Sequence, residues 1–318
     1  MENSRIWVEA WSPEYGSSVE AQKLPESEEA VDTTVETAQW APIGPQPLEW
    51  PRSAFLDGVH RVDARITIET QTSMAGGLLA SVGVGAVIVA GHTGELKGGD
   101  LKRAQFGPSV VSRAAIAGGG QQAVISPISP AVNYSSRSVP GATINDLMQS
   151  LQTLRQEHEL EMARSLASQG YLVIADGPLL GRRGHELIVG LIKSHQRTYL
   201  APEVEPVIGD LGAGQRTPVF CFGQIRPRYS WYIRLAEAPD QHRWSGIVRC
   251  ECSATLSLEQ AVRLADVTSG HLPRFASKGF WDTRAPQNLV PIATLERRLW
   301  HLMGDREMLY RQIRSALR

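Results

Sequence analysis

The chain has 318 residues, of which 42% are hydrophobic and 20% are charged, so it has enough apolar material for a sizeable core. No apolar run reaches the roughly 18–20 residues of a membrane span, and the N-terminus lacks the basic-then-apolar order of a secretory signal. The three cysteines, Cys221, Cys250 and Cys252, show no C-x-x-C spacing, which argues against a zinc site and a disulfide framework. We therefore expect a cytoplasmic protein with no membrane segment.

Charge is unevenly distributed along the chain. Residues 1–50 hold ten acidic and two basic residues, a net of −8; the whole chain is −1, so the remainder is +7. A basic body is compatible with a phosphate-binding groove, although a solvated surface explains the same charges. We predict an acidic extension over residues 1–50 and a single domain over residues 51–318. The extension also carries four tryptophans, which favour some packing on the body or on a partner: Trp7, Trp11, Trp40 and Trp50.

The first part of the predicted domain has strand character. Residues 61–68 alternate polar and apolar side chains with a period of two, and residues 78–90 are rich in Val, Ala and Gly. This pattern predicts a β-meander of about three strands between residues 54 and 90. Residues 91–142 are expected to be rich in loops, with one further short strand at residues 123–125.

A helix is predicted next, over residues 144–169, with Gly170 as its stop. Residues 171–175 (Tyr-Leu-Val-Ile-Ala) then predict a buried central strand that ends at Asp176. A meander, a helix and a buried strand ending in an acid follow the order of an RNase H-like core, though other α/β folds share it. We predict an α/β fold with an RNase H-like core, a mixed central sheet flanked by helices. The remaining candidates are strands at residues 186–193 (or a helix start), 219–225, 230–235 and 246–252, and helices at 257–268, 289–303 and from 305.

Two aspartates carry the chemistry that the sequence suggests. Asp57 and Asp176 each follow an apolar run and precede a glycine, which lets the backbone turn and leaves room for a ligand. Mg²⁺ and Mn²⁺ prefer several oxygen ligands, and phosphodiester cleavage uses such ions at close range. Asp-Gly is also a common turn dipeptide, so each aspartate alone fits an ordinary turn.

The sequence resembles the NurA nuclease family, in a bacterial branch, from about Ala54 to the C-terminus. The resemblance lies in Phe-Leu-Asp-Gly at 55–58, in the helix 154–167 followed by Leu-Val-Ile-Ala-Asp-Gly-Pro-Leu at 172–179, and in the segments 189–194 and 284–296. It implies an RNase H-like fold and a Mn²⁺- or Mg²⁺-dependent deoxyribonuclease that uses a two-metal mechanism. It further implies 5′-to-3′ exonuclease and single-strand endonuclease action in DNA end processing or repair, a homodimer, and a HerA-type hexameric ATPase as partner. The chain has no Walker motif, so translocation by ATP would need such a partner.

The resemblance also implies roles for individual residues. Asp57 and Asp176 match the family's aspartates on the first strand and on the strand after the helix. A helical glutamate is expected between them, among Glu157, Glu159 and Glu161. We favour Glu161, because Leu160 and Met162 flank it as apolar neighbours do in the family, with Glu159 as the alternative.

Two further roles lie later in the chain. Alignment of Pro291 places the late ligand at Glu296, where the family leads us to expect histidine or aspartate; pairing with Arg297 or Arg298 is the alternative. Lys193 matches a lysine near the scissile phosphate, where it could neutralise developing charge. Glu251 is either a further ligand or a partner of Arg249.

Basic residues beyond these suggest contacts with DNA. Arg182, Arg183 and Arg197 surround Lys193 just after Asp176. Arg226, Arg228 and Trp231, together with two neighbouring tyrosines, interleave bases with aromatics, which suits single-stranded DNA. An ordinary strand pair with one aromatic face explains the second group equally well.

Two other functions remain open from the sequence. A non-catalytic adaptor could line the DNA channel of a hexameric translocase without cutting, and a small-molecule binding module would have an apolar pocket in place of an acidic cluster. Convergence of Asp57, a helical glutamate and Asp176 would favour the nuclease. Because residues 1–50 carry no matched motif, we expect them to be dispensable for cutting.

Overall fold

The structure is a computed structural model that describes residues 30–69, 74–91, 104–130, 132–179, 187–195, 199–237, 242–279 and 282–317. The chain divides into two compact units, which are taken in turn. Unit 1 consists of Met1–Phe55, Val87–Gln105 and Ala163–Ala293, and unit 2 of Leu56–Ala86, Phe106–Met162 and Thr294–Arg318.

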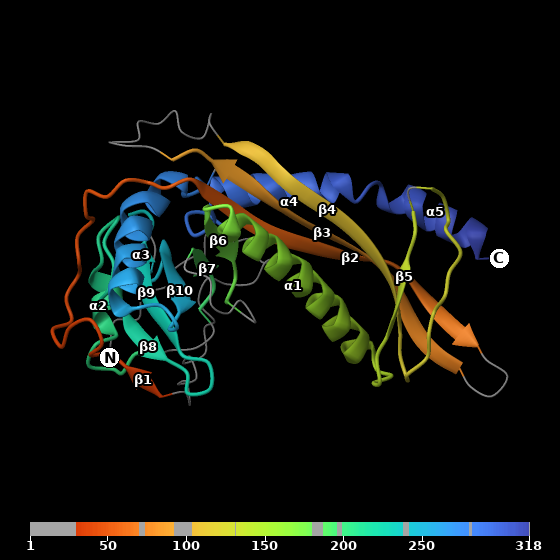
Figure 1. Cartoon of the computed structure of the whole chain (residues 1–318), viewed down its shortest axis with the longest axis horizontal. Coiled ribbons are helices and arrows are strands. Elements are labelled where there is room, and N and C mark those ends of the chain that lie inside the picture. Colours follow the sequence, from red (N-terminus) through yellow and green to blue (C-terminus); the bar gives the residue numbers. More distant parts are fainter. Residues whose placement is uncertain are drawn as a thin grey trace, which may run out of the picture. The chain divides into compact units, whose positions relative to one another are not determined.

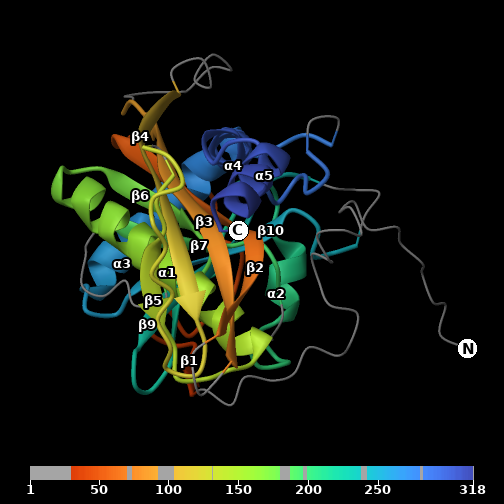
Figure 2. The same ribbon diagram turned by 90° about the vertical axis from the view of Figure 1, so that its right-hand side faces the viewer.

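Unit 2 is built on three long strands, β2 (Ser53–Glu69), β3 (Met74–Val89) and β4 (Gln105–Ala117), with the short β5 (Ser135–Ser138) parallel to β4. Helix α1 (Ile144–Ser168) covers one face of these strands, whereas α4 (Val290–Leu302) and α5 (Arg306–Ala316) cover the other (Figures 1 and 2). Glycine permits the close approach of α4, because a Cβ at Gly85 would lie 3.1 Å from Leu295 Cδ1 and 3.2 Å from Leu299 Cδ2.

The predicted meander is present, but its third strand was predicted wrongly. Residues 105–117, expected to be a loop, form β4, and residues 123–125 do not form a strand. Gly107 and Pro108 disfavour a strand when read locally, since proline lacks the N–H of a ladder. Tertiary pairing outweighs that preference here. Helix α1 agrees with its prediction, and it ends just before Gly170, whose φ of +81° suits the left-handed C-terminal position.

Unit 1 contains the strands that follow the helix. Strands β6 (Leu172–Asp176) and β7 (Ile188–Ile192) are parallel, and β10 (Ile247–Ser253) pairs antiparallel with both β7 and β9 (Arg228–Arg234). Strand β8 (Phe220–Phe222) pairs with β9 and with the two-residue β1 (Val31–Asp32). The helices are α2 (Pro206–Asp210), α3 (Leu258–His271) and the 3₁₀ helix η3 (Leu272–Phe275).

The strand order confirms the predicted fold class. It reads β1-β8-β9-β10-β7-β6-β2-β3-β4-β5, a mixed sheet flanked by helices. The meander β2-β3-β4 precedes α1, and β6 follows α1 and lies next to β2, as the RNase H-like order requires. No helix in the described parts of the chain combines the length and apolar character that crossing a membrane requires.

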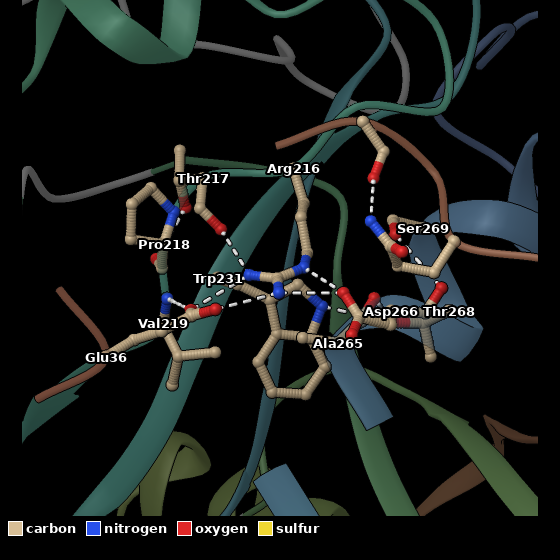
Figure 3. A network of polar contacts seen from close by, with 12 residues as sticks. Glu36, Arg216, Thr217, Pro218, Val219, Trp231, Ala265, Asp266, Thr268 and Ser269 are labelled. Atoms are coloured by element: carbon tan, nitrogen blue, oxygen red, sulfur yellow. Dashed lines mark hydrogen bonds and ion pairs between the residues drawn. The ribbon is translucent and has the colours of Figure 1, made fainter. Parts of the chain in front are cut away.

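Residues 30–50 pack as part of unit 1. Figure 3 shows the buried Arg216 between two acids: its Nη2 lies 2.9 Å from Glu36 Oε1 and 2.7 Å from Asp266 Oδ1. Glu36 also accepts a 2.5 Å hydrogen bond from the N–H of Val219. Trp50 is 1% exposed and its ring lies 5.7 Å from that of Phe275. The predicted boundary at residue 50 thus falls inside a packed region.

These contacts change what we expect of truncation. A chain that begins at residue 30 should match the stability of the full chain, because it keeps every contact described above. A chain that begins at residue 51 should lose folded protein, because the buried Arg216 would lose Glu36, one of its two acidic partners, and the core would lose Trp50. Glu36→Gln leaves Arg216 paired with Asp266, so it should lower the free energy of unfolding by about 2 kcal/mol, the scale of a hydrogen bond to a charged group, measured by urea denaturation.

Glu49→Gln is the matched control, since Glu49 is exposed in the same segment. Equal midpoints for the Glu36 and Glu49 variants, with a stable chain from residue 51, would restore the extension predicted from the sequence.

Candidate metal centre

Asp176 and Lys193 meet at one edge of the sheet. Asp176 ends β6 and Lys193 follows β7, and the carboxyl ends of parallel strands share an edge. The Lys193 ammonium donates a hydrogen bond of 2.6 Å to Asp176 Oδ2. Gly177, with φ of +86°, makes the turn after Asp176 that a side chain would strain. The sequence predicted both residues at the site but not the direct ion pair between them.

A series of side-chain hydrogen bonds also fixes the position of Lys193. Its Nζ donates to Asn288 Oδ1 at 2.9 Å, and Asn288 Nδ2 donates to Asp282 Oδ2 at 2.5 Å. Asn288 is completely buried, so its amide orientation is fixed by these partners. The sequence analysis missed Asp282 and Asn288. The available signal was a polar Gln287-Asn288 pair directly before the apolar stripe of α4.

Asp57 points toward the face of unit 2 that α4 covers. It lies on β2, it is 5% exposed, and its Oδ1 accepts a 2.7 Å hydrogen bond from the N–H of Gly58. Val59 lies on the same side of β2 as Asp57, because side chains alternate along a strand. Val59 also lies close to α4, since a Cβ built on Gly83 would be 3.6 Å from Val59 Cγ2 and 3.5 Å from Leu299 Cβ of α4. Helix α4 also carries Glu296, one turn before Leu299.

Three carboxylates come together in this way. Asp57, Asp176 and Glu296 each offer one oxygen, and these oxygens all lie within 4.8 Å of one another. Oxygens on opposite sides of one hard cation lie roughly 4–5 Å apart, since each metal–oxygen bond is about 2.0–2.6 Å. Three carboxylates and the Lys193 ammonium carry a formal charge of −3 + 1 = −2, which one divalent cation balances. The donor set therefore fits Mg²⁺ or Mn²⁺.

The predicted helical glutamate does not join this group. Glu161 is exposed, and neither Glu161 nor Glu159 is among the three grouped carboxylates, so the choice between them stays a prediction. Glu159 is 2% exposed and ion-paired with Arg155, and its Oε1 lies 2.6 Å from where a Cβ of Gly58 would be. Asp57 and Gly58 face opposite sides of β2. Glu159 packs from α1 against the Gly58 side, whereas Asp57 faces α4.

Glu251 is buried directly behind the turn that follows Asp176. Its Oε1 accepts from the N–H of Leu179 at 2.6 Å and its Oε2 accepts from Arg249 at 2.8 Å. Gly190 permits this packing, because a Cβ there would lie 2.9 Å from the carbonyl of Gly177. The sequence left two roles open for Glu251, a metal ligand or a partner of Arg249, and the contact with Arg249 is present. The carboxylate also anchors the backbone after Asp176 through the N–H of Leu179.

The predicted DNA contacts have different outcomes. Trp231 is completely buried and its indole N–H donates to Thr268 Oγ1, so the prediction that it stacks on DNA bases was wrong. Arg228 pairs with Glu251 at 3.1 Å, and Arg226 is exposed. Arg182, Arg183 and Arg197 lie outside the described residues, and their DNA contacts stay predictions.

The fold and the site together define an α/β protein with a three-carboxylate cluster and an adjacent lysine. No family model and no curated protein matches the sequence. Among solved structures, the chain is similar to the NurA nuclease from Sulfolobus solfataricus, with 11% sequence identity and a TM-score of 0.46 over 85% of this chain and 87% of that chain. A likeness at this level establishes neither family nor activity, so the functional case depends on the residues of this chain.

Removal of the Glu251 charge should destabilise the protein strongly. Glu251→Gln leaves Arg249 buried without its carboxylate, and loss of one partner of a buried pair costs about 3–5 kcal/mol of unfolding free energy. The matched control is Asp210→Asn, which breaks an exposed pair with Arg243 and should cost less than about 1 kcal/mol. Urea denaturation measures both, and equal losses would contradict a buried anchoring role for Glu251.

Proposed function

We propose that the protein is a metal-dependent nuclease whose metal ligands are Asp57, Asp176 and Glu296. The observation that carries the proposal is the approach of three carboxylate oxygens to within 4.8 Å beside the Lys193 ammonium. Carboxylates repel one another at this distance, and a cation bound among them would offset that repulsion. A small-molecule module would present an apolar pocket here, and the cluster is acidic.

The chain's own residues would act on a phosphodiester as follows. Lys193 has three ammonium protons, of which Asp176 and Asn288 accept two, so the third would donate to a non-bridging phosphate oxygen of a bound strand. Asn288 and Asp282 hold the ammonium in place, so little reorganisation is needed as charge develops. A divalent cation bound by the three carboxylates would supply the Lewis acidity and the activated water.

The resemblance in sequence supports the finer parts of the proposal. These are a preference for Mn²⁺, a two-metal mechanism, 5′-to-3′ exonuclease and single-strand endonuclease action, and a role in DNA end processing or repair. They also include a homodimer, a HerA-type hexameric ATPase as partner, and a cytoplasmic location. Glu159 is left out of the proposed ligand set, because it lies on α1 beside Gly58, on the opposite face of β2 from Asp57, and pairs with Arg155.

The test is cleavage of labelled single-stranded DNA with Mn²⁺ and with EDTA. We expect wild-type cleavage with Mn²⁺ alone, and a loss of at least about 100-fold in Asp57→Asn, Asp176→Asn and Glu296→Gln, since each removes a metal ligand. Each variant should also lose the rise in melting temperature that Mn²⁺ gives the wild type.

Glu161→Gln is the matched control, because it removes one negative charge from an exposed position on α1. It should retain cleavage and the Mn²⁺ effect. A wild type that binds DNA but never cuts would support the adaptor. Full activity in Glu296→Gln under limiting Mn²⁺ would remove Glu296 from the site.

A further inference from the structure

An open pocket lies in unit 2, away from the carboxylates. It has a volume of about 750 Å³ and forms where the middle of β2, the start of α1 and the start of α5 meet. Its charged and apolar lining comes from three elements. Arg65 lies on β2, Ile144 and Met148 lie on α1, and Arg306 and Tyr310 lie on α5. All five residues belong to unit 2.

A stripe of basic and aromatic side chains continues from the pocket along α5. Arg306, Tyr310 and Arg314 are spaced four residues apart, so they fall on one side of the helix. Tyr310 is 41% exposed, and the Arg314 guanidinium lies 5.9 Å from its ring centroid. From Arg306 to Arg314 the stripe is about 12 Å long, at roughly 1.5 Å per residue.

The positive charge of this surface is not neutralised locally. Among the described residues, no carboxylate pairs with Arg65, Arg306 or Arg314, and each of these side chains is exposed. Asp63 lines the pocket but is buried and paired with Arg61 at 2.8 Å. Arg65, Arg306 and Arg314 against Asp305 and Glu307 leave a formal charge of 3 − 2 = +1, so the surface is weakly basic and complements an anion.

Apolar side chains beside these arginines narrow the ligand class. Ile144 and Met148 are 42% and 37% exposed, and together with Tyr310 they offer apolar and aromatic surface in the same pocket. A free phosphate would use only the arginines. A strand of nucleotides uses both parts, because its phosphates pair with arginine and its unpaired bases stack on tyrosine.

We infer that the pocket and the α5 stripe, formed by Arg65, Ile144, Met148, Arg306, Tyr310 and Arg314, are a binding site for single-stranded nucleic acid that is separate from the metal centre. This site would hold the substrate strand at a second place, and that role rests on the proposed nuclease function. Binding itself needs neither the metal nor cleavage. The site can therefore be tested apart from the catalytic proposal.

The experiment is fluorescence anisotropy of the full-length protein with a labelled short oligothymidylate in EDTA, over a range of salt. We expect wild type and Asp176→Asn to bind equally. Tyr310→Ala should weaken binding about 10-fold, which corresponds to one lost stacking contact. The double variant Arg65→Gln/Arg306→Gln should reduce the slope of log affinity against log salt by about 1.4, since each lost phosphate contact contributes about 0.7.

Arg311→Gln is the matched control on the same helix. Arg311 is exposed, but five residues place it about 140° round the helix from Arg306. It should leave affinity nearly unchanged, and all variants should keep the wild-type melting temperature. Equal weakening by Arg311→Gln would show general electrostatic attraction and overturn the site. Binding that appears only with Mn²⁺ would also overturn the proposed site, even if cleavage persists. So would an affinity that is unchanged in both Tyr310→Ala and Arg65→Gln/Arg306→Gln.

Discussion

Repulsion among the carboxylates of Asp57, Asp176 and Glu296 is the constraint on which the proposed centre depends. Like charges at this separation destabilise a fold unless a cation compensates them, and the interaction grows where water is excluded. Lys193 compensates one charge through its 2.6 Å contact with Asp176. In the proposed centre, a divalent ion bound by the three carboxylates would offset their negative charge further.

Rigid elements hold the carboxylates against this repulsion. Asp57 lies within the 17-residue strand β2, and Asp176 ends β6, whose following turn is anchored by Glu251 through the N–H of Leu179. Glu296 is carried on α4, which packs closely on β3 because Gly85 has no side chain.

The sequence predicted parts of the site with different success. Asp176 ends β6 as its apolar run predicted, whereas the strand end predicted at Asp57 was wrong, because β2 continues through Gly58 to Glu69. Glu296 was placed on the chain by the alignment of Pro291. Other features depend on tertiary packing. Glu159 and Glu161 lie about 200° apart on a helix, and only the packing of α1 decides which of them is buried.

Several residues could not be assigned from local pattern for the same reason. Trp231 alternates with arginines and tyrosines, but its strand is covered by α3, where Thr268 accepts its N–H. Asn288 contacts Lys193 across a sequence separation of 95 residues, which no local signal reveals. Strand β4 contains Gly107 and Pro108 and forms only because neighbouring strands complete it. Long-range contacts therefore decide what periodicity leaves open.

The most direct measurement is an anomalous-difference map at the manganese absorption edge, from crystals of the protein equilibrated with Mn²⁺. The account predicts a peak within about 2.6 Å of carboxylate oxygens from Asp57, Asp176 and Glu296. It also predicts that this peak is absent in crystals of Asp176→Asn treated in the same way. A manganese peak elsewhere, with the three carboxylates empty at saturating Mn²⁺, would contradict the central claim.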